Sequence, residues 1–288
     1  MLTIRNPVEW SLDQVKHATE AVEHAGIAVR RAQADLHSPA PAVSHIRAAD
    51  LRSALAAGFD DFAASRTDVV MLCLIYPVLG LILFRLASGH QLLPLLFPIA
   101  SGFALVGPFA ALGLYEMSRR REQGADIGWA DAFGVVNSPA IASIVLLGVV
   151  LIGIFLLWLV AAEAIYLFTL GPASPASLAS FVRDVFTTGA GWTMIVVGIG
   201  VGFLFALAVL AIGAVSFPLL LDRGGGLDTA VATSVRAVLA NPGPMALWGL
   251  IVAGGLVIGS IPFFLGLAVV VPVLGHASWH LYRRVVVA

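Results

Sequence analysis

Hydrophobic residues fill three long blocks of the chain, and polar residues gather before and between these blocks. The blocks cover residues 69–118, 140–221 and 244–282. A helix needs about 20 mainly apolar residues to cross the hydrocarbon core of a bilayer. Because every block exceeds that length, the pattern predicts a protein that crosses a membrane several times.

Each of the first two blocks divides at a polar linker into two predicted spans. The first block gives spans over residues 69–87 and 92–117, and the second gives spans over about 140–170 and 190–221. Two spans joined by a short linker form a helical hairpin, so these blocks predict two hairpins.

The third block, at residues 245–282, is short for two spans and long for one. Pro262 marks a break within it, because proline has no N–H group to donate to a helical hydrogen bond. A span on either side of Pro262 brings the total to about six. We therefore predict an all-α, polytopic membrane helix bundle of three hairpins.

A short amphipathic stretch precedes each predicted hairpin, and arginine ends each one. We interpret these features as three repeats, at about residues 46–122, 126–223 and 227–284, each with a cytoplasmic amphipathic helix and a hairpin. The alternative is that any hairpin protein places such helices and arginines at its cytoplasmic face. The amphipathic stretches have apolar residues spaced four and three apart, which lines one helical face: Leu55, Phe59 and Phe62; Trp129, Phe133 and Val136; Val231, Val235 and Val238.

Residues 1–45 form a separate predicted unit, a cytoplasmic amphipathic helix with a linker. Asn6 and Pro7 suit the N-cap and the first position of a helix. From Val8 to Leu36, valine or leucine recurs every seven residues. This spacing fits a thin coiled coil, or an amphipathic helix that lies on the bilayer or against the cytoplasmic loops. We expect residues 6–37 to offer a surface to protein partners.

The composition agrees with residence in a lipid bilayer. Of the 288 residues, 59% are hydrophobic and 11% are charged, whereas a soluble domain has about 25% charged residues. The formal net charge is −1 and no basic stripe occurs, which excludes a nucleic-acid partner. The single cysteine, Cys73, excludes an intrachain disulfide. The composition does not indicate an oligomeric state.

The basic residues indicate the orientation, because cytoplasmic loops are rich in Lys and Arg. With six spans and a cytoplasmic N-terminus, only Arg85 and Arg183 of the 16 Lys and Arg residues lie outside. A five-span arrangement would move Arg283 and Arg284 to the wrong side. We therefore expect both termini to be cytoplasmic. Because residues 1–10 do not resemble a signal peptide, we expect the first apolar block to act as its own insertion signal.

Ionisable side chains at membrane depth are costly and often functional. Glu163 is the deepest predicted acid and lies in the outer half of the third span. It is a candidate for carrying a proton or binding a transported cation, with Arg85 and Glu116 as further candidates. The alternative is that the long third span overshoots the bilayer and leaves Glu163 at the interface.

His276 and His280 are four residues apart in the last predicted span, so one helical face carries both imidazoles. This pair is a candidate metal site, with Cys73 and Glu116 as possible further ligands. The alternative is that the histidines belong to a headgroup-level belt with Trp279 and its neighbours. Two histidines on one helical face cannot lie on opposite sides of a porphyrin, and the only other histidine beyond the N-terminal segment, His90, lies in a predicted outer loop. A two-histidine haem site within this chain is therefore excluded, whereas a haem shared with another subunit stays open.

Sequence motifs of common enzymes do not occur. There is no HExxH sequence, and Ser143, Ser216 and Ser260 lack a nearby histidine. We therefore expect a non-enzymatic protein without a cofactor. The GxxxG sequences at residues 198–202 and 255–259 are typical of closely packed membrane helices.

Five sequence motifs carry a resemblance to a known family. They are LCLIYP at residues 72–77, GLYEMSRRRE at 113–122, SFPLLLDR at 216–223, ATSVRAVLANP at 232–242 and LGHASWHLYR at 274–283. Over about residues 46–284 the chain resembles the DUF2189 family of predicted bacterial integral membrane proteins. The resemblance implies a multi-pass protein of the bacterial inner membrane and implies no activity, ligand or catalytic residue.

Two functions fit these observations. The first is a non-enzymatic accessory or scaffold protein of a membrane complex. The second is a small-solute or ion transporter, coupled to protons, with a path lined by Glu163, Arg85 and kinked helices. The first is favoured because so few polar residues occur in the predicted spans.

Overall fold

A computed structural model describes residues 41–64, 93–125 and 127–287, together with residues 78, 81, 82 and 85. The N-terminal heptads and most of the first predicted span, with Cys73, lie outside the described residues. Apart from loops, turns and an isolated β-bridge between Val43 and Val286, the described part is helical. Its helices are α2 (Ala48–Ala64), η1 (Leu93–Leu95), α5 (Leu96–Ala110), α6 (Leu112–Glu122), η2 (Trp129–Asn137), α7 (Ile141–Thr169), α8 (Leu178–Thr187), α9 (Gly189–Gly213), α10 (Ser216–Arg223), α11 (Leu227–Ala240), α12 (Pro242–Ser260) and α13 (Leu267–Val285).

Three stretches of the described chain are long and apolar enough to cross a membrane. They are Ile141–Thr169, Gly189–Arg223 and Pro242–Ser260, and they coincide with the third, fourth and fifth predicted spans. The outer surfaces of α7 and α9 expose large apolar side chains such as Phe168 and Phe203. Such surfaces are suited to lipid rather than water.

Two predicted spans are interrupted near their polar ends. The span predicted at 92–117 ends as α5 and continues, after Ala111, as the separate helix α6. The span predicted at 190–221 divides at Ala214 and Val215 into α9 and α10. Pro218 lacks the N–H that would donate to the carbonyl of Ala214 in a continuous helix, whereas Pro108 lies within α5 and the N–H of Ala111 still donates to Gly107 O at 2.9 Å.

The predicted break at Pro262 lies in the turn between α12 and α13. Phe263 and Phe264 in this turn have positive φ angles of 52° and 65°, a conformation that is uncommon for bulky residues. Gly255 and Gly259 of α12 face α13, since a Cβ at either glycine would lie within 3.2 Å of atoms of Val270, Leu274 or Leu267. The second GxxxG sequence therefore brings two neighbouring helices together, as predicted.

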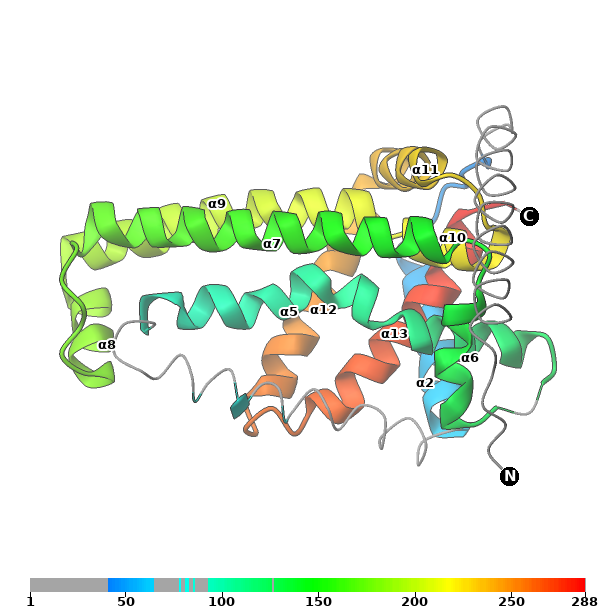
Figure 1. Cartoon of the computed structure of the whole chain (residues 1–288), viewed down its shortest axis with the longest axis horizontal. Helices are drawn as coiled ribbons and strands as arrows, with labels where there is room; N and C mark the ends of the chain where they lie inside the picture. The colour runs from blue at the N-terminus through cyan, green and yellow to red at the C-terminus, as the bar shows by residue number, and fades with distance from the viewer. Residues whose placement is uncertain are drawn as a thin grey trace, which may run out of the picture. The chain divides into compact units, whose positions relative to one another are not determined.

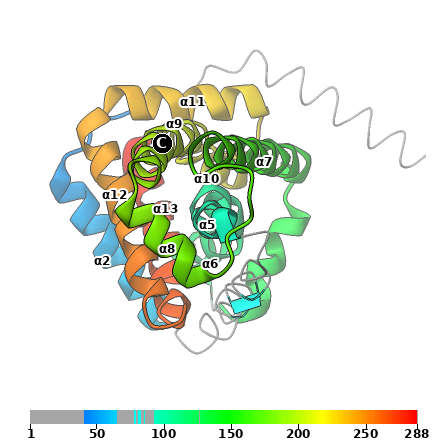
Figure 2. The same cartoon turned by 90° about the vertical axis from the view of Figure 1, so that its left-hand side faces the viewer.

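The helices α7 and α9 lie side by side, and α5 packs against both of them. The short helix α8 lies at one end of this group (Figure 1). At the opposite end, α6, α10 and the C-terminal half of α13 meet, with α2 packed along α13. We call this end, formed by α2, α6, α10 and residues 275–285 of α13, the polar end. Figure 2 shows α2 on the outside of α12 and α13.

The polar end also contains many of the most deeply buried large side chains. Trp279 and Tyr282 of α13, Phe217 and Leu220 of α10, and Met117 of α6 are all 1% exposed or less. An apolar core therefore joins these three helices, and the charged residues described below surround it.

The amphipathic helices each pack against a helix that ends a predicted hairpin. The helix α2 packs against α13, η2 packs against α6, and α11 packs against α9 and α10. The face of α2 that is buried differs from the predicted one: Leu51, Ala54, Gly58, Asp61 and Phe62 are buried, whereas Phe59 is exposed. The buried face thus includes the carboxylate of Asp61, which the spacing of apolar residues alone does not indicate.

Candidate functional site

The polar end contains a network of ionisable side chains that links α2, α6 and α13. The network is possible because α2 and α13 approach each other closely. A Cβ at Gly58 of α2 would lie 2.5 Å from the backbone nitrogen of Ala277 in α13. Only glycine lets the two backbones come so near at this point, and Asp61, one turn after Gly58, is thereby brought against the histidines of α13.

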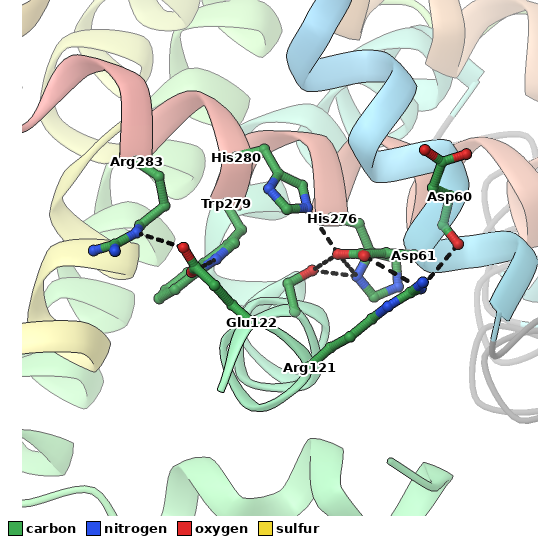
Figure 3. Close-up of polar contacts among 9 residues, drawn as sticks. Asp60, Asp61, Arg121, Glu122, His276, Trp279, His280 and Arg283 are labelled. Carbon is green, nitrogen blue, oxygen red and sulfur yellow. Dashed lines mark hydrogen bonds and ion pairs between the residues drawn. The ribbon is translucent and has the colours of Figure 1, made fainter. Parts of the chain in front are cut away.

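Asp61 is the centre of this network (Figure 3). Its side chain is buried, with 7% of the residue exposed. Its Oδ2 atom accepts a hydrogen bond from Ser118 Oγ at 2.6 Å and one from His280 Nε2 at 2.8 Å. Its Oδ1 atom lies 3.3 Å from the guanidinium of Arg121. One carboxylate from α2 therefore holds two groups from α6 and one from α13.

The pKa of the Asp61 carboxyl lies below its ordinary value. Burial acts to raise this pKa, but the hydrogen bonds from His280 and Ser118 and the charges of the two histidines outweigh burial. Hydrogen bonds to the ionised form of a carboxyl favour that form. Asp61 is therefore an ionised acceptor in the folded protein.

His276 joins the network through Ser118. Its Nδ1 atom lies 2.7 Å from Ser118 Oγ and 4.0 Å from Asp61 Oδ2. Because the Ser118 hydroxyl donates its proton to Asp61, His276 Nδ1–H is the donor to Ser118. Ser118 and His276 are each 1% exposed, so a substrate has no access to this serine and histidine.

A second group of charges links α6, α10 and α13. Arg283 contacts Glu122 of α6 and Asp222 of α10, each at 3.2 Å. Tyr282 donates a hydrogen bond to Asp222 at 2.6 Å, and the indole N–H of Trp279 donates to Glu122 at 3.2 Å. Figure 3 shows Arg283 and Trp279 pointing toward Glu122. One turn of α13 thus connects all three helices.

Glu116 belongs to a third group, which attaches η2 to α6. It is 1% exposed and accepts hydrogen bonds from Arg119 at 2.8 Å and from Arg120 at 2.7 Å. The hydrogen bond to Glu116 raises the pKa of Arg119. Arg120 also pairs with Asp131 of η2 at 2.5 Å. The arrangement makes Glu116 a structural anchor for two arginines.

Except for the two histidines, the structure places the predicted site residues apart from one another. His276 and His280 share the carboxylate of Asp61, as described above. Glu163 lies on α7, half-buried, and forms no hydrogen bond or ion pair with other described residues. Arg85 is described only as an exposed helical residue. The structure therefore does not bring Glu116 or Glu163 to the histidine pair.

Metal binding by His276 and His280 stays a prediction. Across residues 41–64, 93–125 and 127–287, no three or more His, Cys, Asp and Glu residues are arranged to hold a metal ion. The imidazole atoms nearest Asp61 and Ser118 are already used in hydrogen bonds. Cys73, a further ligand suggested by the sequence, lies outside the described residues.

Asp61, Ser118 and Asp222 were not apparent as site residues from the sequence. Asp61 did leave a signal, since it follows Leu51, Ala54 and Gly58 at helical spacing on one face of α2. A carboxylate in such a position requires a buried partner. Ser118 and Asp222 gave no such signal in the sequence, because their roles depend on how distant helices pack.

Comparison with known families identifies one match. Residues 96–222 match the model of a family described as predicted integral membrane protein (DUF2189). Neither the search of curated proteins nor that of solved structures found a match to this chain. The matched region contains α5 to α9 and all but the last residue of α10, and therefore includes Ser118, Glu122 and Asp222 of the polar end.

Proposed function

Since the chain belongs to the DUF2189 family of predicted integral membrane proteins, we propose that it is a multi-pass protein of the bacterial inner membrane that acts as a scaffold. In this proposal six spans form three hairpins, both termini are cytoplasmic, and the polar end faces the cytoplasm. The protein is a non-enzymatic accessory subunit of a membrane complex.

The observation that supports this proposal is that the polar end, whose helices are joined by ion pairs and hydrogen bonds, leaves apolar side chains exposed. Ion pairs and hydrogen bonds hold α2, α6, α10, η2 and α13 together. The amphipathic helices nevertheless expose Phe59 of α2, Phe133 of η2 and Leu239 of α11, by 56%, 57% and 73%. Fixed helices with exposed large apolar side chains are typical of interaction surfaces.

The test is purification in a mild detergent, followed by identification of the proteins that co-purify. We expect the triple substitution Phe59→Ser, Phe133→Ser and Leu239→Ser to remove specific partners. Phe168→Ser is a matched control, because Phe168 is 90% exposed but lies at the far end of α7. Identical sets of co-purifying proteins for wild type and the triple variant would contradict the scaffold proposal.

A second candidate function, a proton-coupled transporter, rests on Glu163. This half-buried carboxyl lies in a candidate span and has no ion pair within the described helices. Glu163→Gln separates the two functions. A scaffold keeps its partners when Glu163 is changed, whereas a proton-coupled transporter in vesicles loses proton-driven solute uptake.

A further inference from the structure

An apolar cavity lies at the end of the bundle opposite to the polar end. It has a volume of about 330 Å³, is partly open to the surface, and is lined by residues of η1, α5, α7, α8 and α9. Its lining is almost wholly apolar and includes Phe97, Trp158, Phe181, Ile195 and Gly198. This volume is near the lower end of the range for ligand pockets.

The polar atoms at the wall of this cavity already have partners. The Tyr166 hydroxyl donates to the carbonyl of Ala173 at 2.6 Å, and Trp158 Nε1–H donates to Ser101 at 3.1 Å. A polar ligand would therefore lose its hydrogen bonds to water without gaining new ones, which costs free energy. An apolar lining of this kind favours a hydrocarbon group over a polar one.

The helix α8 covers the cavity with one face and carries charge on the other. Phe181, Val182 and Val185 line the cavity, whereas Arg183 and Asp184 are exposed. Because α8 connects the ends of two candidate spans, it is placed as an amphipathic helix at the level of lipid headgroups.

Charges of both signs lie near the cavity. Arg183 and Asp184 form no side-chain ion pair within the described part of the chain, and neither does Glu163, which follows the cavity residue Ala162. Asp184 directly precedes Val185, another residue of the cavity lining. An arginine suits a phosphate, and two carboxylates suit an amine.

We propose that this cavity binds one acyl chain of a bilayer phospholipid whose headgroup carries both a phosphate and an amine. The acyl chain fills the space beneath α8, Arg183 binds the phosphate, and Glu163 and Asp184 attract the amine. This gives Glu163 a role that requires neither transport nor a protein partner, so the proposal does not depend on the scaffold function.

Gly198 allows the cavity to be filled without disturbing the helices. A Cβ at Gly198 meets no atom within 4 Å, so Gly198→Phe can project its ring into the cavity. Gly200→Phe is the matched control, because Gly200 lies on the same helix, also has open space around its Cβ, and is outside the cavity lining. Both variants place one phenylalanine on α9.

The experiment uses the full-length protein in vesicles of phosphatidylethanolamine and phosphatidylglycerol. Each lipid in turn carries a photoreactive group on one acyl chain. We expect the phosphatidylethanolamine probe to label peptides of α8 and α9 at the cavity, and Gly198→Phe to reduce this labelling about tenfold, or about 1.4 kcal/mol of binding free energy. The probe should label the Gly200→Phe variant to the same extent as the wild type.

A further variant tests the headgroup contacts. Glu163→Gln combined with Asp184→Asn should abolish the preference for phosphatidylethanolamine over phosphatidylglycerol, while the acyl chain still labels the cavity. Equal labelling of wild type and Gly198→Phe would overturn the site. An absence of cavity labelling, or labelling by free fatty acid but not by phospholipid, would overturn it as well.

Discussion

Asp61 joins three helices through a single carboxylate. A carboxylate on the buried face of α2 is costly by itself, and its three partners compensate this cost. Removing one member of a buried charged group leaves the others without partners, which is more harmful than the absence of the whole group. Asp61 is therefore the residue of the polar end whose substitution should have the largest effect.

We predict that Asp61→Asn lowers the stability of the folded protein by about 1–3 kcal/mol, because the amide replaces an ionised acceptor of several hydrogen bonds. The measurement is the midpoint of thermal unfolding in detergent. Asp60→Asn is a suitable control, since Asp60 is exposed and contacts Arg121 only through its backbone carbonyl. Equal midpoints for the two variants would contradict the central role of Asp61.

The lowered pKa of Asp61 also predicts a dependence on pH. A carboxyl whose pKa is lower in the folded state than in the unfolded state stabilises the fold at pH values above its unfolded pKa. This stabilisation is lost as the pH falls through the folded pKa. We expect the midpoint difference between wild type and Asp61→Asn to be largest near neutral pH and to shrink in acid. A difference that grows in acid would contradict this assignment.

At the scale of helices, glycines decide which elements can approach. Gly58 of α2 touches the backbone of Ala277, whereas Gly153 of α7 has open space around its Cβ position. Alanine is normally favoured over glycine in a helix by about 0.5–1 kcal/mol. Replacing glycine by alanine should therefore lower the stability of the protein at Gly58 and leave it unchanged or raise it at Gly153.

We expect Gly58→Ala to destabilise the protein by about 1–3 kcal/mol through overpacking of α2 against α13. Gly153→Ala should be neutral or slightly stabilising. Thermal unfolding of both variants, with cross-linking of α2 to α13 as a second readout, distinguishes helix separation from a general loss of stability. An unchanged midpoint for Gly58→Ala would show that the two helices can separate at little cost.

The hydrophobic pattern alone predicted the third, fourth and fifth spans, because each is strongly apolar over a length that can cross a bilayer. It did not predict the break after α5 or the separate helix α10. In both, apolar residues continue past the break, so hydropathy gives no signal. The break at Ala214 and Val215 combines Pro218 with a distant partner: Ser234 of α11 accepts a hydrogen bond from the backbone N–H of Val215 at 3.1 Å.

The candidate site was predictable only in part for a related reason. His276 and His280 were apparent because they share one helical face, and the arginines because they follow apolar blocks. Their partners Asp61, Glu122 and Asp222 lie far away in sequence, and of these three acids only Asp61 left a signal, through its helical spacing with the buried residues of α2. Tertiary contacts between distant helices, rather than local pattern, determine these pairs.

At the scale of the whole molecule, orientation in the membrane is the prediction with the widest consequences. We expect a cysteine at Ser174, in the exposed linker between α7 and α8, to react with an impermeant maleimide added outside the cell. A cysteine at Gln123, beside the polar end, should react only after the membrane is opened. Cys73→Ala provides the background. Reaction of the residue-174 position from the cytoplasmic side alone would overturn the six-span arrangement.

The pairing of the segment before α2 with the segment after α13 ties assembly to the order of synthesis. Ser44 N–H donates to Val285 O at 2.8 Å, and Val287 N–H donates to Ala42 O at 3.0 Å. During translation α2 emerges long before its partner α13 exists, and domains generally fold as their chain becomes available. The buried face of α2, with Asp61, must therefore wait for α13. If translation stalled before residue 267, that face would lack its main partner and would stay open to proteases and chaperones.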